Sequence, residues 1–248
     1  MKISIAASLV GLLAFGANAH MEVMSPPPFR SRYNPYTTDI DYSMTNPLSG
    51  SGSDFPCKGY HSLLGTSQGQ SVATWKPGST YTMTVAGSAT HNGGSCQVSL
   101  SYDKGKTFKV IHSYIGNCPL QTSWSFTLPN DTPAGSALFA WSWWNNLGNR
   151  EMYMNCAHVT ISSAKSAGTR EIGAGEEQEE AQVEKRAPSD PFASRPNMFV
   201  ANVGNGCSTL ETYDVLFPNP GPDVTYASSK TASPVGSCGT TFAKAYKA

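Results

Sequence analysis

The sequence contains few charged residues for its length. Only 14% of its 248 residues are Asp, Glu, Lys or Arg, whereas an average domain has about 25%. The 17 acidic and 17 basic side chains cancel, and no run of basic residues is present. A nucleic-acid or membrane-surface partner would select basic patches, so we expect neither. The 5 Trp, 11 Tyr and 10 Phe exclude a chain that is disordered throughout.

Long apolar runs are absent after the amino terminus. Residues 1–19 have the three parts of a secretory signal peptide, namely Lys2, an apolar stretch over 3–15, and the small residues Ala17 and Ala19 at a cleavage site. The apolar stretch is too short for a membrane anchor. We therefore expect a secreted, extracellular protein whose mature chain begins at His20.

The sequence also has no CxxC motif, which argues against a structural zinc site or a thioredoxin-like site. Its six cysteines instead suit disulfides formed in an oxidising compartment. Spacing leaves three pairings open for the first four cysteines. We expect Cys207 and Cys238, which follow a Glu-rich segment, to pair with each other.

Short strand-like runs follow one another from residue 70 onwards. In one of them Tyr81, Met83 and Val85 alternate with threonines, the period of a strand with one buried face. Turn sequences rich in Gly, Pro, Asn and Asp separate the runs. Seven such runs at intervals of about ten residues indicate an all-β fold, an antiparallel β-sandwich with long loops. The expected strands are 71–75, 80–86, 96–102, 109–115, 122–128, 137–144 and 153–161.

The remaining segments differ in composition. Residues 20–65 are rich in turn signals and are predicted to be loops. Residues 163–196 hold six of the nine Glu and almost no large apolar side chain, which predicts a disordered linker. Lys185-Arg186 in this linker is either a processing-protease site or an ordinary pair of solvated charges. We expect a sandwich domain over 20–162 and a C-terminal disulfide-containing segment of unknown role over 197–248, either a small stapled unit or a tail packed on the sandwich.

Two histidines are candidate metal ligands. An amino-terminal His20 would carry an α-amine and an imidazole Nδ1 that can close a chelate ring on one metal ion, although a His at this position can also arise by chance. His91 lies in a Gly-rich connection between two expected strands, at the rim of the sandwich. We expect the other three histidines to have structural or surface roles; they are His61, His112 and His158.

The start of the last expected strand is a second candidate element. Glu151, Tyr153 and Asn155 would share one face of a strand there. A carboxylate and a phenol on one face near a strand end suit a metal site. The alternative is an ordinary strand with a paired Glu and a half-buried Tyr.

Four segments stand in an informative order and spacing: His20-Met21, 53–58, 87–100 and 148–157. Together they resemble the chitin-active lytic polysaccharide monooxygenases of auxiliary activity family eleven, a fungal type. The resemblance covers about residues 20–162, which matches the expected sandwich.

The resemblance implies a copper enzyme on an immunoglobulin/fibronectin-like sandwich. One copper ion would be bound by the amine and Nδ1 of His20 and by Nε2 of His91. Tyr153 would lie in the distal axial position, Ala89 would shield the opposite side, and Glu151 would position the oxygen species. Copper binds such nitrogen ligands readily in both redox states, and a nearby Glu can relay a proton.

The implied activity is oxidative cleavage of glycosidic bonds in chitin, at C1. An external electron donor with O2 or H2O2 would be consumed, and the protein would act as a monomer. The sequence shows no pair of carboxylates of the kind that hydrolases use. One alternative is a copper-binding or cell-wall-binding protein of the same fold without cleaving activity, and another is a carbohydrate-binding sandwich without metal. The implied disulfides are Cys57–Cys156 and Cys96–Cys118.

Further side chains have expected roles outside the metal site. We expect Trp141, Trp143 and Trp144 to pack in the core rather than to stack on sugars. Candidate polysaccharide contacts are Tyr33, Tyr36 and Tyr60. Asn130 begins a glycosylation sequon in an expected turn.

Overall fold

The computed structural model describes residues 20–163 and 191–239. The predicted signal peptide over residues 1–19, most of the Glu-rich segment and Lys185-Arg186 lie outside the described residues. The strands of the first part are β1 (Met21–Ser25), β2 (Ala73–Trp75), β3 (Thr80–Gly87), β4 (Gly94–Ser101), β5 (Lys109–Ile115), β6 (Ser123–Thr127), β7 (Gly135–Asn145) and β8 (Met152–Ile161). Those of the second part are β9 (Cys207–Ser208), β10 (Asp214–Val215), β11 (Val224–Tyr226), β12 (Thr231–Ala232) and β13 (Val235–Gly236). The described helices are short 3-10 turns, η1 (Cys57–Leu63), η2 (Ser67–Gly69) and η3 (Phe192–Ser194).

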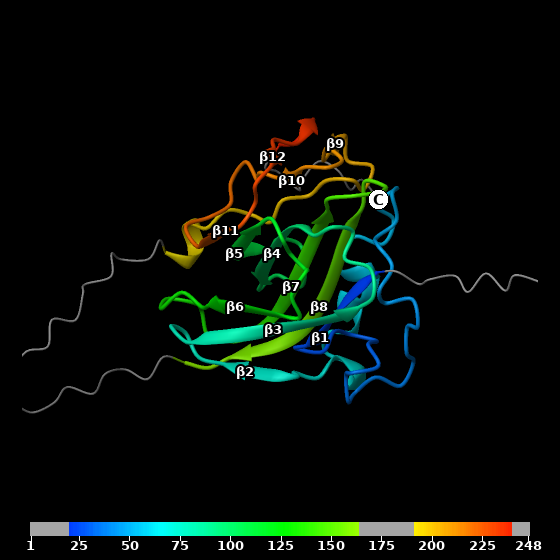
Figure 1. Ribbon diagram of the computed structural model, residues 1–248. Helices are drawn as coiled ribbons and strands as arrows, with labels where there is room; N and C mark the ends of the chain where they lie inside the picture. The colour runs from blue at the N-terminus through cyan, green and yellow to red at the C-terminus, as the bar shows by residue number, and fades with distance from the viewer. Residues whose placement is uncertain (1–19, 164–190, 240–248) are drawn as a thin grey trace, which may run out of the picture.

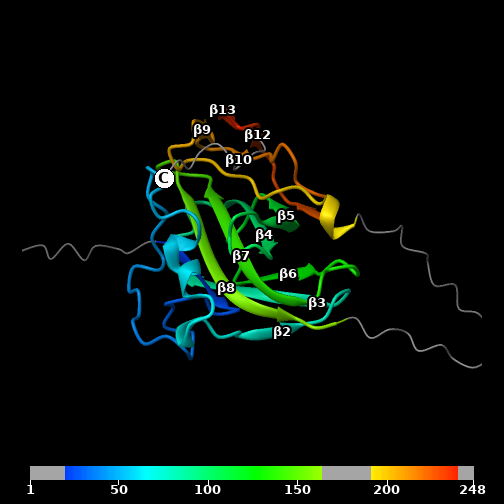
Figure 2. The ribbon, with the colours of Figure 1, turned by 180° about the vertical axis from the view of Figure 1, so that it is seen from behind.

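Two sheets form the predicted sandwich (Figures 1 and 2). The larger has the order β11-β5-β4-β7-β8-β2, and the smaller the order β1-β3-β6. In the larger sheet the central strands β5, β4, β7 and β8 are antiparallel. Its edge strands β11 and β2 run parallel to their neighbours β5 and β8. The all-β prediction is confirmed, and each strand expected between residues 71 and 161 is present with its ends shifted by at most two residues.

Alternating apolar side chains build the core between the two sheets. Cys96, Val98 and Leu100 of β4 point into it and are at most 1% exposed. Trp141 and Trp143 belong to the same core, while Trp144 points to the opposite face of the large sheet, where a second apolar cluster lies. All three indoles are buried, which confirms their packing role.

The opposite face of the large sheet is covered by residues 191–239, which we call the C-terminal segment. In Figure 1 this yellow-to-red chain lies over β4 and β5. Strand β11 extends the sheet next to β5, and Phe199 and Phe217 pack on Trp144 at ring-centroid distances of 5.1 and 5.2 Å. The buried Arg195 donates to the carbonyl of Ile111 at 2.9 Å. The segment is therefore a third layer of the described fold.

Polar side chains of β4 face this third layer. All eight residues of β4 are buried, because the C-terminal segment covers the face that carries its Ser and Gln side chains. Ser95 Oγ donates to the carbonyl of Val215 at 2.9 Å. Gln97 accepts the Phe199 N–H at 2.9 Å and donates to Ser113 Oγ at 3.0 Å. These hydrogen bonds satisfy groups whose burial would otherwise be costly.

The region 20–65 contains more regular structure than predicted. Strand β1 pairs with β3, and η1 lies within the stretch predicted to be loop. The short β1 was missed because Pro26 to Pro28 follow it at once. Its pairing places His20 at one end of the small sheet.

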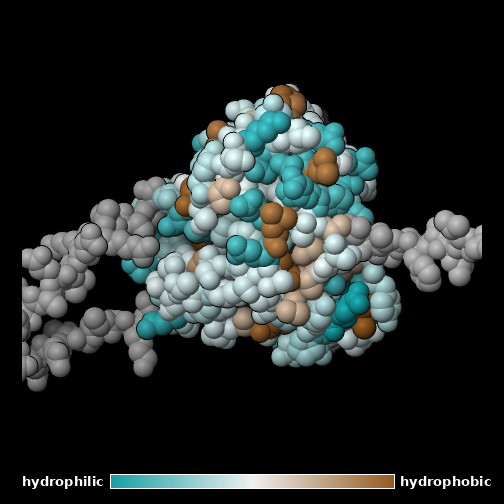
Figure 3. All heavy atoms as spheres, viewed as in Figure 1, coloured by the Kyte–Doolittle hydropathy of each residue, from teal (hydrophilic) through white to brown (hydrophobic). Residues whose placement is uncertain are grey.

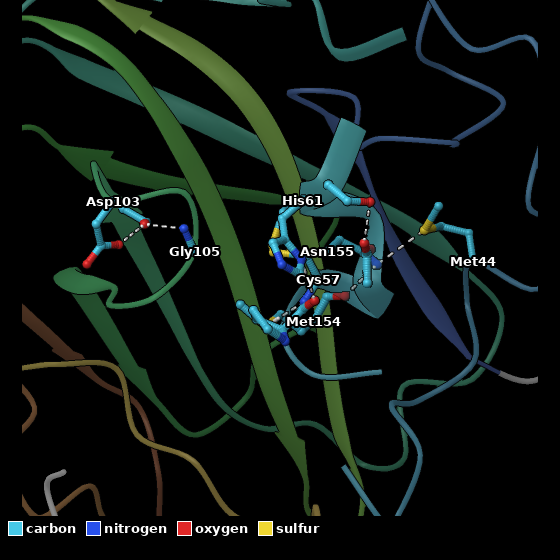
Figure 4. Close-up of a disulfide and its surroundings, with 12 residues drawn as sticks. Met44, Cys57, His61, Asp103, Gly105, Met154 and Asn155 are labelled. Carbon is cyan, nitrogen blue, oxygen red and sulfur yellow. Dashed lines mark hydrogen bonds between the residues drawn. A yellow bond between two sulfur atoms is a disulfide. The ribbon is translucent and has the colours of Figure 1, made fainter. Parts of the chain in front are cut away.

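Three disulfides tie these parts together. Cys57–Cys156 joins η1 to β8, with a Cα–Cα distance of 5.3 Å (Figure 4). Cys96–Cys118 joins β4 to the turn after β5, and Cys207–Cys238 closes a loop within the C-terminal segment. No helix in residues 20–163 or 191–239 is long and apolar enough to cross a membrane.

Candidate metal centre

His20 is positioned by the pairing of β1 with β3. Met21 lies opposite Gly87, so His20 lies one residue beyond the end of the ladder. A Cβ at Gly87 would lie 2.1 Å from the backbone oxygen of His20, and no side chain fits in that space. The glycine at the end of β3 is therefore required for the approach of the amino-terminal strand.

His91 is held by a tight turn between β3 and β4. His91, Asn92 and Gly93 have φ values of 47°, 58° and 79°, a left-handed run that is unfavourable for side chains other than Gly and Asn. Hydrogen bonds fix this run: Gly93 N–H donates to the Thr90 carbonyl at 2.7 Å, and Leu147 N–H donates to the His91 carbonyl at 3.0 Å. A strained backbone that the surroundings hold in place is typical of functional sites.

Glu151 and Tyr153 lie at the start of β8. The Tyr153 side chain is 1% exposed, and its ring stacks on Trp143 with a centroid distance of 4.3 Å. Its hydroxyl donates to Glu151 Oε2 at 2.7 Å and lies 3.3 Å from His91 Nε2. Because the phenol proton goes to Glu151, a phenol lone pair faces the His91 nitrogen.

These side chains converge at one end of the sandwich. One possible ligand atom from each of His20, His91 and Glu151 lies within 4.8 Å of the others. The two imidazole rings have a centroid distance of 5.5 Å, and the His20 ring lies 5.7 Å from that of Tyr153. The structure thus brings together side chains that are up to 133 positions apart in the sequence, from His20 to Tyr153.

The donor set fits a metal ion that prefers nitrogen ligands. His20 Nδ1 is buried and has no hydrogen-bond partner in the described structure, which is unusual for a buried polar atom. A metal ion would satisfy it. Imidazole nitrogens suit copper, zinc, iron and nickel, so the side chains alone admit several metals.

The protonation states agree with such a site. Burial lowers the pKa of His20, while the charge of Glu151 opposes this effect, so the imidazole is available as a neutral ligand at neutral pH. Burial, and then the hydrogen bond to Glu151, raise the pKa of the Tyr153 phenol. Tyr153 therefore remains a protonated hydrogen-bond donor.

The other histidines make hydrogen bonds elsewhere. His112 Nε2 contacts Thr225 Oγ1 at 2.8 Å, His158 lies between Ser136 and the Gly69 carbonyl, and His61 Nδ1 contacts the Pro56 carbonyl at 3.1 Å. His61 also lies beside the Gly105 turn in Figure 4. Ala89 is half-buried two residues before His91.

The predicted sugar contacts differ in exposure. Tyr33 and Tyr36 are 39% and 40% exposed. Tyr60 is half-buried, with the Arg30 guanidinium 4.7 Å from its ring centroid and its hydroxyl on Asp41, so one ring face is taken. Tyr42, which is not among the predicted contacts, is 77% exposed. Asn130 lies exposed in the turn after β6.

Sequence reasoning also missed the supports of the site. Lys58 Nζ donates to the Asn46 carbonyl at 2.9 Å, and its charge is one of the influences that lower the pKa of His20. Arg150, next to Glu151, donates to the carbonyls of Asn145 and Gly148. Its position beside Glu151 was the signal available in the sequence.

Comparison with known proteins gives the family. No family model matches the chain. It is 50% identical over 212 residues to AA11 family lytic polysaccharide monooxygenase A of Aspergillus fumigatus, covering 84% of this chain and 86% of that protein. It is 38% identical to the monooxygenase B of A. fumigatus and 36% identical to an AA11 family lytic polysaccharide monooxygenase of A. oryzae, with 88% and 93% of this chain covered.

The matched proteins differ in length. This chain covers 52% and 53% of the second and third relatives. Among solved structures, a cellulose-active polysaccharide monooxygenase from M. thermophila matches with 18% identity and a TM-score of 0.41, over 59% of this chain and 77% of that one. The identity and coverage of the first relative show that the chain belongs to the AA11 family of lytic polysaccharide monooxygenases.

Proposed function

We propose that this protein is a secreted, copper-dependent lytic polysaccharide monooxygenase that cleaves chitin by oxidation at C1. The observation that carries the proposal is the convergence of His20, His91 and Glu151, with ligand atoms within 4.8 Å of one another, in a member of this family. After cleavage behind Ala19, the α-amine and Nδ1 of His20 and Nε2 of His91 would hold the copper ion. Tyr153 would lie beside the bound ion, since its hydroxyl is 3.3 Å from His91 Nε2.

Each side chain has a separate task. Copper, when bound, supplies the redox chemistry that inserts one oxygen atom into a C–H bond of the sugar, with O2 and an external electron donor, or H2O2, as co-substrate. Tyr153 orients Glu151 through its 2.7 Å hydrogen bond. Glu151 is half-exposed. Its carboxylate holds a proton and transfers it beside the metal.

The surface around His91 suits an uncharged, insoluble partner. Three leucines near this histidine are exposed: Leu120, Leu147 and Leu210, at 47%, 48% and 39%. Leu120 lies against Gly93, Leu147 donates to the His91 carbonyl, and the Leu210 carbonyl accepts from Arg150. Apolar contacts of this kind suit the CH faces and N-acetyl methyl groups of chitin.

The test uses the mature protein, whose start at His20 is first verified by amino-terminal sequencing. It is loaded with copper and incubated with chitin and a reductant, with and without H2O2. Mass spectrometry should then detect chito-oligosaccharides that end in an aldonic acid, the product of C1 oxidation.

Two controls define the claim. His91→Ala should remove copper binding and oxidised products together, and activity that survives this change would refute the ligand assignment. Tight copper binding without oxidised products from several chitins would favour a copper-binding or cell-wall-binding protein instead. Products from cellulose but not from chitin would contradict the proposed substrate.

A further inference from the structure

We infer that the C-terminal segment is a positioning part of the metal centre, and that it acts through Glu211 and Asn202 on the loop over residues 145–151. We call this loop the site loop. The inference rests on the proposed function because it treats His91 and Glu151 as parts of a copper site. It assigns a role to a segment that follows the sandwich residues 20–162 in the sequence.

The site loop contacts His91 directly. Its Leu147 N–H donates to the His91 carbonyl at 3.0 Å, and its Asn146 N–H donates to the Gly93 carbonyl at 2.9 Å. Gly148 lies against the imidazole, since a Cβ added there would be 3.5 Å from His91 Nδ1. The loop also ends in Glu151. The position of the site loop therefore determines the orientation of His91, a proposed metal ligand, and of Glu151, the proposed proton carrier.

The C-terminal segment holds the site loop at several points. Glu211 Oε1 accepts the Gly148 N–H at 3.0 Å, and Asn202 Nδ2 donates to the Glu151 carbonyl at 3.0 Å. Further along, Thr212 N–H donates to the Asn146 carbonyl at 2.8 Å. Backbone groups at both ends and in the middle of the loop are thus bound by residues more than 50 positions away.

The segment is itself firmly anchored where it meets the loop. Asp214 accepts from Asn146 Nδ2 at 2.9 Å and from Ser228 Oγ at 2.6 Å. Asn202 accepts the Thr209 N–H at 3.0 Å through its Oδ1, and the Cys207–Cys238 disulfide closes a loop that contains Thr209 and Asp214. Because these contacts fix the C-terminal segment, its hydrogen bonds can hold the site loop in one position.

Groups that orient a metal ligand from outside commonly change metal affinity by about 10- to 100-fold when they are removed. Glu211 acts on His91 through Gly148, so we expect the lower end of this range. Its side chain is exposed, so its loss should leave the core intact. Glu211 is a positioning residue in this scheme, since it touches neither metal nor substrate.

The experiment compares Glu211→Ala with Glu211→Gln in the full mature chain. Alanine removes the acceptor of the Gly148 N–H, while glutamine keeps an oxygen at that place. We expect Glu211→Ala to weaken copper binding about tenfold and to alter the Cu(II) electron paramagnetic resonance spectrum, and Glu211→Gln to restore both. Val224→Ala, at a 40% exposed site on β11 of the same segment, is the matched control and should match the wild type.

A readout without metal keeps the two proposals apart. Amide hydrogen exchange of Leu147 and Gly148 in the copper-free protein should become faster in Glu211→Ala and remain slow in Glu211→Gln. Unchanged exchange, or wild-type copper affinity and spectrum in Glu211→Ala, would overturn the inference. A wild-type chain that binds no copper would contradict the proposed function, and the exchange rates would still decide whether Glu211 holds the loop.

Discussion

At the scale of single residues, the Tyr153 hydroxyl links the two parts of the site. It donates to Glu151 and lies beside His91 Nε2, while its ring is fixed by stacking on Trp143. Since its raised pKa keeps the phenol protonated, the carboxylate of Glu151 always has a donor. One lone pair of that carboxylate is thereby occupied, and the remaining ones stay available for a proton.

Glu151→Gln tests this division of tasks. The amide oxygen can still accept from Tyr153, so the fold and the copper affinity should be retained, but glutamine cannot take up a proton. We expect product formation to fall by about 10²-fold or more, the usual contribution of a proton-transfer group.

Initial rates and copper titrations of Glu151→Gln would be measured side by side. Asp39→Asn changes a carboxylate that is 72% exposed and paired with Arg30, so it serves as the control with wild-type rates. A Glu151→Gln enzyme of full activity would show that this carboxylate carries no proton in the reaction.

Local patterns pointed to His20, His91, Glu151 and Tyr153 as candidates, the family resemblance implied their roles, and the structure places all four at one end of the sandwich. Sequence reasoning did not reach Glu211 or Asn202. Their partners are backbone groups of Gly148 and Glu151, and a contact with backbone leaves no mark in the pattern of side chains. Contacts of this kind, between residues far apart in the sequence, can be identified only in the folded structure.

At the scale of strands and loops, alternation was sufficient to find the strands between residues 71 and 161, but not β1, and it did not say what covers the sheets. The outward Ser and Gln side chains of β4 have the pattern of a strand that faces water. They are buried because the C-terminal segment covers this face, and it supplies hydrogen-bond partners for two of them: the Val215 carbonyl for Ser95 and the Phe199 N–H for Gln97. A polar face can thus be an internal face.

Gln97→Ala tests how much the hydrogen bonds between β4 and the C-terminal segment contribute to stability. The change removes the partners of the Phe199 N–H and of Ser113 in a place that is fully buried. We expect the free energy of unfolding to fall by about 1–3 kcal/mol, with the Tm lower by about 2–4 °C for each kcal/mol.

Thermal unfolding of Gln97→Ala would be compared with that of Gln121→Ala. Gln121 is exposed in the turn before β6, so its loss should shift the Tm by no more than about 1 °C. Equal shifts in the two variants would argue that the C-terminal segment is only loosely attached to β4.

At the scale of the whole molecule, the scarcity of charge belongs to the sandwich. Residues 20–162 have eight Lys or Arg and seven Asp or Glu. On the small sheet, hydroxyls pair across the strands instead, as in Thr80 with Thr127 at 2.8 Å and Thr82 with Ser125 at 3.3 Å. Figure 3 shows this lower part of the molecule in pale colours of intermediate hydropathy, with stronger teal over the C-terminal segment.

We therefore expect binding to chitin to depend little on salt. Screening at about 1 M salt shortens the Debye length to about 3 Å and abolishes long-range attraction between charges, but neutral contacts are unaffected. The bound fraction on insoluble chitin should change less than about twofold between 0.05 and 1 M NaCl. A steep loss of binding with salt would show that charged side chains such as Arg32 or Arg150 dominate the contact.

The third layer also determines where the enzyme can be truncated or fused to other domains. A chimera that kept residues 20–162 alone would leave β5 as an open strand edge, since β11 is its neighbour in the sheet. It would also uncover Trp144, which Phe199 and Phe217 protect. An open edge beside exposed aromatic rings promotes aggregation. A fusion partner should therefore be attached after residue 239. The unit to transfer to another protein is the sandwich together with the C-terminal segment.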